Sequence, residues 1–232
     1  MYTKGMIENA RILHMRFPDA RIQIYAADDV PTDILQHLSD MPRVKIQREA
    51  NKRGILNMFD RFKAIDDPDC SIMFVRDADS RPHDRDIACI EDFLQSKKSL
   101  HIIRDHLYHG PIAIPGGLWG IRKSGLREPM RVTLAKWLRS TTRLVKKGDD
   151  QTFLRDRIYP LLKSNAMIHD RIRRLKGEIY TPFRVDIQGR LFCGQVHRYD
   201  ASGVEYTEFD PYSRDVTQPL LGLPPDDQCW SL

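Results

Sequence analysis

The sequence predicts an α/β fold in which a mostly parallel sheet is covered by helices on both faces. Three observations lead to this prediction. Apolar residues alternate along the chain between the 3.6-residue period of amphipathic helices and short β-branched runs. The run Ile72–Val75 is continuously apolar, as in a strand buried on both faces. The length of 232 residues suffices for one large domain with a sizeable core.

The predicted helices are the segments in which apolar residues recur at helical spacing. In the first of them Ile7, Ala10 and Leu13 share one face. The second has Pro31 in its first turn, where the missing N–H of proline is tolerated. In chain order, the predicted helices are 3–16, 31–38, 54–66, 85–97, 127–145 and 150–163.

The predicted strands are shorter runs that alternate or are wholly apolar. In chain order they are 21–25, 44–46, 71–75, 100–103, 117–121 and 166–168. Because these strands alternate with helices, a mostly parallel sheet is favoured. From about residue 177 the pattern weakens and prolines become frequent. We therefore expect a single domain over 1–200 and an irregular C-terminal tail over 201–232.

Composition argues against a membrane-spanning or secreted protein. No apolar run approaches the roughly 20 residues of a spanning helix, and the first residues lack the apolar core of a secretory signal. Four scattered cysteines, with no Cys-x-x-Cys, disfavour a zinc ribbon and a disulfide framework. We expect reduced thiols in a cytoplasmic protein.

The positive charge is unevenly distributed. The formal net charge is +5, and the stretch Arg122–Lys147 alone holds nine Lys or Arg and one acid, Glu128. Such a stretch is either a solvated helix face or a contact for nucleic acid, an anionic membrane or a phosphorylated substrate.

The most informative segment is Phe74–Arg81, in which Asp77 and Asp79 directly follow the buried strand. Residues i and i+2 of an extended chain point to the same side, so both carboxylates can face one cation. Carboxylates suit Mg²⁺ or Mn²⁺, and ligands of open α/β sheets bind beyond the carboxyl ends of the strands. The corresponding chemistry is metal-assisted departure of a diphosphate. The alternative is a structural turn.

Two other Asp-x-Asp matches are present, and their contexts differ. Asp67 and Asp69 lie in a predicted turn before the strand. Asp84 and Asp86 lie in the first turn of the next helix, where carboxylates suit the helix dipole. Context therefore singles out Asp77 and Asp79.

Polar groups crowd the end of the 100–103 strand. Arg104, Asp105 and His106 follow it, and then Gly116 and Gly117 allow a backbone to approach a ligand or form a tight turn. His101, His106 and His109 could also form a zinc site. A loop this rich in Arg and Asp is more typical of hydrogen bonding to a polar substrate.

Three acidic or imidazole side chains later in the chain are further candidates. Asp149 is a candidate N-cap of the 150–163 helix, and Asp150 would then lie in its first turn with the carboxylate free for a hydroxyl substrate. His169 follows the last predicted strand, as Asp77 follows the 71–75 strand. It is either a third metal ligand at the same sheet edge or a plain surface histidine.

The order of these segments resembles that in GT-A-fold glycosyltransferases, in particular the small glycosyltransferase domains of bacteria and large algal viruses. The start Tyr2-x-x-Gly5-x-x-x-Asn9 and the segment Met58-Phe-Asp-Arg61-Phe are also similar to that group. The likeness covers roughly residues 1–200. In order, its later motifs are Arg-Asp-x-Asp-Ser-Arg (76–81), His-x-x-Arg-Asp-His-x-Tyr-His (101–109), Gly-Gly-x-Trp-Gly (116–120), Asp-Gln-x-Phe-Leu (150–154) and His-Asp (169–170).

The resemblance implies a single GT-A-like, Rossmann-related domain with metal-dependent glycosyltransferase activity. A sugar would move from a nucleotide-sugar donor, a UDP-sugar in preference to a GDP-sugar, to a hydroxyl of a glycan acceptor. Mn²⁺ or Mg²⁺ would lie at Asp77 and Asp79, with His169 the first choice for a histidine near the metal and His197 the reserve.

The resemblance also implies roles for other residues. Arg61 and Arg76 would brace the diphosphate or hold the strand end. The implied nucleotide-binding residues are Tyr2, Gly5, Arg61, Arg76 and Asp77. The implied sugar- or acceptor-binding residues are Arg104, Asp105, His106, Gly116, Gly117 and Trp119. The implied catalytic residues are Asp150 and Asp149.

One feature departs from the group. Its domains open with a strand before the Tyr-x-x-Gly turn, whereas this chain begins at that turn. We therefore expect the sheet to lack the usual first strand.

Two alternative functions remain open. A metal-dependent phosphodiesterase or nuclease would use clustered Asp and His, but usually needs more than two clustered carboxylates. A non-enzymatic basic module would bind nucleic acid or an anionic surface through Arg122–Lys147, with steep salt dependence and no dependence on a nucleotide sugar or a metal. On the leading interpretation no stable nucleic-acid complex is expected, and the basic stretch offers peripheral contact with an anionic surface.

Overall fold

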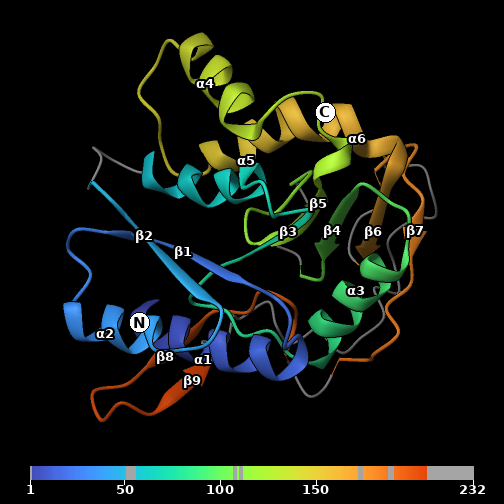
Figure 1. Cartoon of the computed structure of the whole chain (residues 1–232). Coiled ribbons are helices and arrows are strands. Elements are labelled where there is room, and N and C mark those ends of the chain that lie inside the picture. The colour runs from blue at the N-terminus through green and yellow to red at the C-terminus, as the bar shows by residue number, and fades with distance from the viewer. Residues whose placement is uncertain are drawn as a thin grey trace.

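The computed structural model describes residues 2–50, 56–106, 109, 112–171, 175–187 and 191–207, which form an α/β fold with helices around mixed sheets (Figure 1). The helices are α1 (Tyr2–Arg16), α2 (Thr32–Ser39), α3 (Asp84–Gln95), α4 (Met130–Ser140), α5 (Asp149–Phe153) and α6 (Tyr159–Leu162), with the 3₁₀ helices η1 (Leu56–Asp66), η3 (Lys123–Gly125) and η5 (Lys163–Asn165) and the π-helical turn η4 (Leu154–Ile158). The strands are β1 (Ile22–Ala27), β2 (Val44–Glu49), β3 (Ile72–Arg76), β4 (Leu100–Arg104), β5 (Leu118–Arg122), β6 (Ala166–Asp170), β7 (Tyr180–Thr181), β8 (His197–Tyr199) and β9 (Glu205–Thr207).

The expectation of one mostly parallel sheet is only partly right. Strands β1 and β2 pair in parallel as a separate two-stranded sheet, and the five-stranded sheet has the order β3-β5-β4-β6-β7. In the larger sheet β4, β6 and β7 are parallel, whereas β5 is antiparallel to both of its neighbours. The described residues between β4 and β5 contain no crossover α-helix, so β5 returns beside β4 in the opposite direction.

The larger sheet is packed on both faces, and its central strand β4 is buried throughout. On one face Met73, Val75 and Trp119 pack beneath η1 and the layer formed by α4, α5 and α6, which Figure 1 shows above the sheet. Phe62 lies edge-on to Trp119 with ring centroids 5.4 Å apart. On the other face Phe74 contacts Phe93 of α3. The sequence-based prediction that the 71–75 strand is buried on both faces is therefore only partly right, because Met73 and Val75 are buried whereas Phe74 on the other face is half-buried.

Two predicted helices differ from those observed. The predicted helix 127–145 is shorter, since α4 begins after Pro129 and ends at Ser140, before two threonines with poor helix propensity. The predicted helix 150–163 is interrupted by η4, just ahead of Pro160, whose ring nitrogen has no hydrogen to donate to the preceding turn. Only part of the predicted 54–66 helix is described, and that part is the 3₁₀ helix η1.

The region after residue 177 is more ordered than the sequence predicted. Strand β7 joins the edge of the large sheet, and β8 and β9 form an antiparallel hairpin. This hairpin crosses the boundary expected at residues 200 and 201, because His197 pairs with Thr207. The remainder of the expected tail, 208–232, lies outside the described residues.

Candidate active site

The Asp77–Asp79 segment forms a turn immediately after β3. The Ser80 amide and hydroxyl both donate to the Asp77 carbonyl oxygen, at 3.3 and 3.1 Å. The backbone is therefore not extended here, as the i, i+2 argument assumed. The two carboxylates still interact electrostatically: burial and then the negative charge of Asp77 raise the pKa of Asp79. A cation placed between them would relieve this repulsion.

Arg61 joins two of the predicted site residues that lie far apart in sequence. One guanidinium nitrogen donates to the Asp77 carboxylate, and Nη2 donates to Oδ2 of Asp150 at 2.7 Å. Arg61 comes from η1, Asp77 from the end of β3 and Asp150 from the first turn of α5. The arginine thus holds the two acidic segments against each other.

Asp150 is buried, with 1% of its surface exposed, yet only half of its carboxylate is satisfied. Its Oδ2 accepts from Arg61, whereas no hydrogen-bond partner is found for Oδ1 among the described residues. A buried carboxylate oxygen without a donor is costly, so it is expected to be retained for a ligand or a reaction.

Gly116 and Gly117 lie directly against these carboxylates. A Cβ atom on Gly117 would lie 2.1 Å from an Asp77 carboxylate oxygen, and one on Gly116 would lie 2.8 Å from both Arg61 and Asp150. These glycines are required by space rather than by a positive φ angle. Four segments of the chain therefore meet in one cluster of Arg61, Asp77, Asp150 and the glycine pair, which we call the Arg61 cluster.

The N-terminal helix packs onto the Asp77–Asp79 turn through the residues of its predicted motif. The Asn9 side chain donates to the Asp77 carbonyl oxygen at 3.2 Å, and a Cβ on Gly5 would lie 2.1 Å from the Ala78 carbonyl oxygen. Tyr2 is 60% exposed, and burial followed by the charges of Asp79 and Asp77 raises the pKa of its phenol. Tyr2 is thus an accessible aromatic ring beside the two carboxylates.

His197, the reserve histidine, lies beside the turn, whereas His169 does not. The His197 amide donates to the Asp79 carbonyl oxygen at 2.7 Å, and burial lowers the pKa of its imidazole. His169 lies on β6, three strand spacings or about 14 Å from β3 in the sheet order. Its ring lies between His101 and Asp92, at 3.2 and 3.3 Å, so the structure does not bring it to Asp77.

The residues that follow β4 form a buried network of their own. Arg104 pairs with Asp170 and with Glu178, and Asp105 accepts two hydrogen bonds from Arg85. His106 is stacked on Phe192, with ring centroids 4.0 Å apart. The partners found for these three predicted sugar-binding side chains among the described residues lie outside the Arg61 cluster. Tyr108, which belongs to the same motif, lies outside the described residues.

Three further predicted residues have structural partners. The Arg76 guanidinium makes two hydrogen bonds to Asp86 of α3, which favours the alternative that it holds the strand end. The Trp119 side chain is fully buried in the core beneath η1. Asp149 accepts two hydrogen bonds of 2.7 Å from Arg143, and this pairing lowers its pKa to about 2.

Arg81 is the last residue of the Arg-Asp-x-Asp-Ser-Arg motif, and no role was predicted for it from the sequence. Its guanidinium donates to the Ala78 carbonyl oxygen at 3.2 Å and to Glu205 of β9 at 2.9 Å. Arg81 therefore ties the Asp77–Asp79 turn to the C-terminal hairpin. The position of Arg81, two residues after Asp79, is a sequence feature that could have drawn attention to it. Its partner Glu205 could not be identified in this way, because it lies 124 residues away.

The donor set of the turn fits a hard divalent ion. Among the described residues, no group of three or more His, Cys, Asp or Glu side chains is arranged to hold a metal. The turn offers two carboxylates, and magnesium-type ions are often held by one or two carboxylates together with substrate phosphates. The mutual repulsion that contributes to the raised pKa of Asp79 is the feature that a cation would remove.

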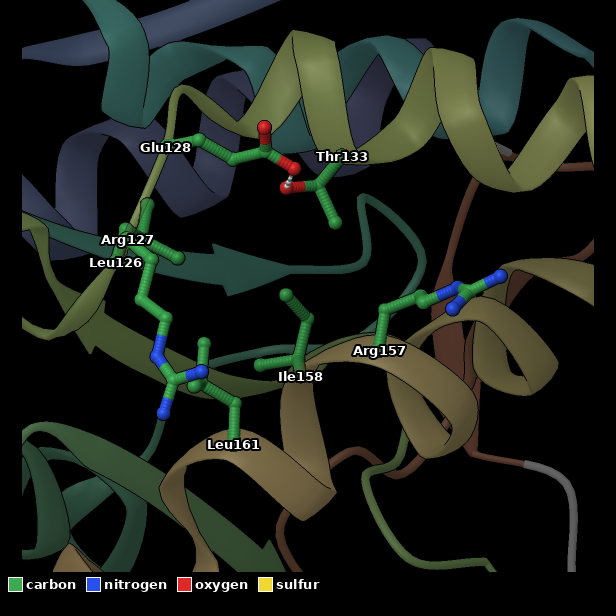
Figure 2. Close-up of a pocket in the computed structure, with 7 residues that line it drawn as sticks. All are labelled: Leu126, Arg127, Glu128, Thr133, Arg157, Ile158 and Leu161. Atoms are coloured by element: carbon green, nitrogen blue, oxygen red, sulfur yellow. Dashed lines mark hydrogen bonds between the residues drawn. The ribbon is translucent and has the colours of Figure 1, made fainter.

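A pocket of about 350 Å³ lies elsewhere, between the segment that precedes α4 and the η4–α6 helix (Figure 2). It shares no residue with the Arg61 cluster. Its lining residues are Leu126, Arg127, Glu128, Thr133, Arg157, Ile158 and Leu161.

Comparison with protein-family models, with curated proteins and with solved structures finds no match for this chain. Across the described residues, no helix combines the length and apolar character that crossing a bilayer requires. The described cysteines, Cys70, Cys89 and Cys193, are free thiols.

Proposed function

We propose that this chain is a metal-dependent glycosyltransferase with a GT-A-like domain, which acts in the cytoplasm on a nucleotide-sugar donor and a hydroxyl of a glycan acceptor. One observation carries the proposal: Arg61 links Asp77 to Asp150 against Gly116 and Gly117. Four segments that the resemblance identified separately thus converge on one place, although they are distant in sequence.

Asp77 and Asp79 would hold Mn²⁺ or Mg²⁺ together with the donor diphosphate. The metal, when bound, would supply neutralisation of the charge that develops on the leaving diphosphate. Arg61 places a guanidinium between Asp77 and Asp150 and so fixes the orientation of both carboxylates. Tyr2 would contact the nucleotide, since its ring is exposed next to the turn.

Asp150 is the better candidate of the two predicted catalytic carboxylates. Its Oδ2 is held by Arg61, while no described residue donates to Oδ1, so Oδ1 can accept the proton of an acceptor hydroxyl in an inverting reaction. In a retaining reaction the same oxygen would orient the sugar. Asp149 has both carboxylate oxygens occupied by Arg143, which assigns it to positioning the start of α5.

The test is thermal stabilisation by UDP, GDP and their sugars, each with and without Mn²⁺. A nucleotide at about 100 times its Kd should add about 2.7 kcal/mol, or roughly 5–10 °C in Tm for a domain of this size. Asp79→Ala should lose the Mn²⁺-dependent part. The matched control is Asp69→Ala, from another Asp-x-Asp pair, where Asp69 is exposed and should leave the response unchanged.

The outcome also separates the alternatives. Stabilisation by a UDP- or GDP-sugar that needs Mn²⁺ supports the transferase, whereas metal-dependent cleavage of a phosphodiester with no nucleotide-sugar response favours the nuclease. Stabilisation by DNA alone favours the nucleic-acid module. An unaltered Mn²⁺ response in Asp79→Ala rules out the metal assignment.

Asp150→Asn tests the second half of the site. We expect this variant to retain nucleotide-induced stabilisation and to lose transfer by about 10²–10⁴-fold, the usual contribution of a general base. Asp149→Asn is the neighbouring control and should retain most of the transfer rate. Equal transfer by Asp150→Asn and the parent chain would remove Asp150 from the mechanism.

A further inference from the structure

The positive charge of this protein is concentrated in one layer of the fold. Residues 122–163, which include α4, α5, η4 and α6, contain 12 Lys or Arg and four Asp or Glu, a net charge of +8 by this count. The whole chain carries +5, so the remainder is −3 by subtraction. This segregation gives the layer an attraction for anions that the rest of the molecule lacks.

The loop 141–148 between α4 and α5, together with the end of α4, presents both an apolar side chain and exposed positive charges. Leu144 is 92% exposed. Arg139, Lys146 and Lys147 are also exposed, and within the described part of the chain none of the three forms an ion pair, although the charge of Lys146 contributes to the lowered pKa of Asp149. A single exposed leucine is ordinary on a protein surface. Here it lies among basic side chains, and this combination suits the interface of an anionic membrane.

The fold imposes the exposure of Leu144. The next residue, Val145, packs against the main hydrophobic core. Asp149 holds the loop on both sides of Leu144, because it accepts hydrogen bonds from the Arg143 guanidinium and, at 2.8 Å, from the Lys146 amide. The loop is therefore anchored on either side of Leu144, and the leucine projects from it.

We propose that the 141–148 loop and the adjoining end of α4 dock onto an anionic membrane surface, with Leu144 entering the boundary between headgroups and acyl chains. Basic residues near anionic lipids each contribute about 1 kcal/mol, and apolar side chains add to this by insertion. This membrane-docking role is additional to the proposed transfer reaction and does not depend on it.

A soluble polyanion fits this surface less well. Proteins that bind single-stranded nucleic acid stack its bases on accessible aromatic side chains. In residues 122–163 the aromatic side chains, Trp137, Phe153 and Tyr159, are all buried. An exposed leucine contributes nothing to a polyanion in water, whereas it has a use at a lipid interface.

The test is sedimentation of the full chain with vesicles of phosphatidylcholine alone or mixed with phosphatidylglycerol, at about 0.1 M salt, where the Debye length is about 10 Å. Binding is expected only with the anionic vesicles. Lys146→Gln combined with Lys147→Gln should lower the partition coefficient about 25-fold, since each basic residue is worth about a factor of five. Leu144→Ser, which changes no charge, should lower it severalfold.

Arg48→Gln combined with Lys97→Gln is the matched control, because both residues are exposed and lie on β2 and just after α3. It removes the same charge and should leave vesicle binding unchanged. The proposal is overturned by equal binding to both kinds of vesicle, by no binding to anionic vesicles, or by an equal loss in the control pair. Binding of heparin or DNA in place of vesicles, unaffected by Leu144→Ser, would assign the surface to a soluble polyanion instead.

Discussion

Two polar clusters follow strands of the same sheet, and they are built in opposite ways. After β4, Arg104 and Asp105 are fully buried and every charge is paired, with Asp170 and Glu178 around the arginine and Arg85 on the aspartate. After β3, the Asp77 side chain is 46% exposed, Asp79 experiences the like charge of Asp77, and one oxygen of Asp150 has no donor within the described ranges.

The difference separates structural charge from charge held ready for a ligand. A buried network in which every group is satisfied contributes rigidity, because breaking it leaves a bare charge in a medium of low dielectric constant. A cluster that keeps like charges together with an unpaired oxygen is unfavourable on its own and is improved by a ligand. Both clusters look alike in sequence, as runs of Arg, Asp and His after an apolar strand.

The largest expected effect is on the structural side of this comparison. Arg104→Ala should lower the free energy of unfolding by about 3–5 kcal/mol, because the buried carboxylates of Asp170 and Glu178 would both lose the guanidinium that bridges them. Urea denaturation measures this loss. Arg127→Ala, which removes an exposed arginine, should change stability by less than about 0.5 kcal/mol. A similar small change for Arg104→Ala would contradict the structural assignment.

A smaller effect on stability, with a large effect on the site, is expected for Gly117→Ala. The new Cβ would displace the Asp77 carboxylate, at a cost of about 1–2 kcal/mol, and the Mn²⁺-dependent nucleotide response should disappear. Gly177→Ala is the control, since its φ of 83° makes alanine strained by a similar amount in open space. Retention of the response in Gly117→Ala, measured by thermal shift, would show that Asp77 is dispensable.

The smallest effect is expected for Asp149→Asn. Arg143 lowers the pKa of Asp149 from its ordinary value to about 2, so the ion pair stabilises the folded state above the unfolded pKa of about 4 and this contribution is lost as the pH falls through about 2. Because Arg143 is half exposed, we expect a loss of only about 1 kcal/mol at pH 7 that is reduced by salt. Denaturation at pH 7 and near pH 2 should show the difference between variant and parent disappearing at the lower pH.

Local patterns predicted the α/β class and the place of most elements. The strand before Asp77 and the helix that carries Gly5 and Asn9 were found because burial on both faces and helical spacing are visible within a few residues. The antiparallel direction of β5 was missed, since direction depends on how the chain returns through space. The C-terminal hairpin was missed because its strands are only three residues long.

The candidate site was predicted only in outline. Asp77, Asp79, Asp150, Gly116 and Gly117 were named from sequence, but so were Arg104, Asp105, His106 and Trp119, which the fold places in buried networks or in the core. His169 was preferred to His197 as the histidine near the metal because it follows a predicted strand and was expected at the same sheet edge as Asp77. It did not hold because three strand spacings separate β6 from β3.

The sequence by itself determined the alternation of helices and strands, the acidic turn after a buried strand and the basic segment from 122 onward. Each of these features depends only on residues that are close together in the chain. Only the tertiary structure decided which charges meet. Arg61 finds Asp77 and Asp150 at separations of 16 and 89 residues, and Arg81 finds Glu205 at 124. Such pairings depend on strand order and packing, which no local pattern contains.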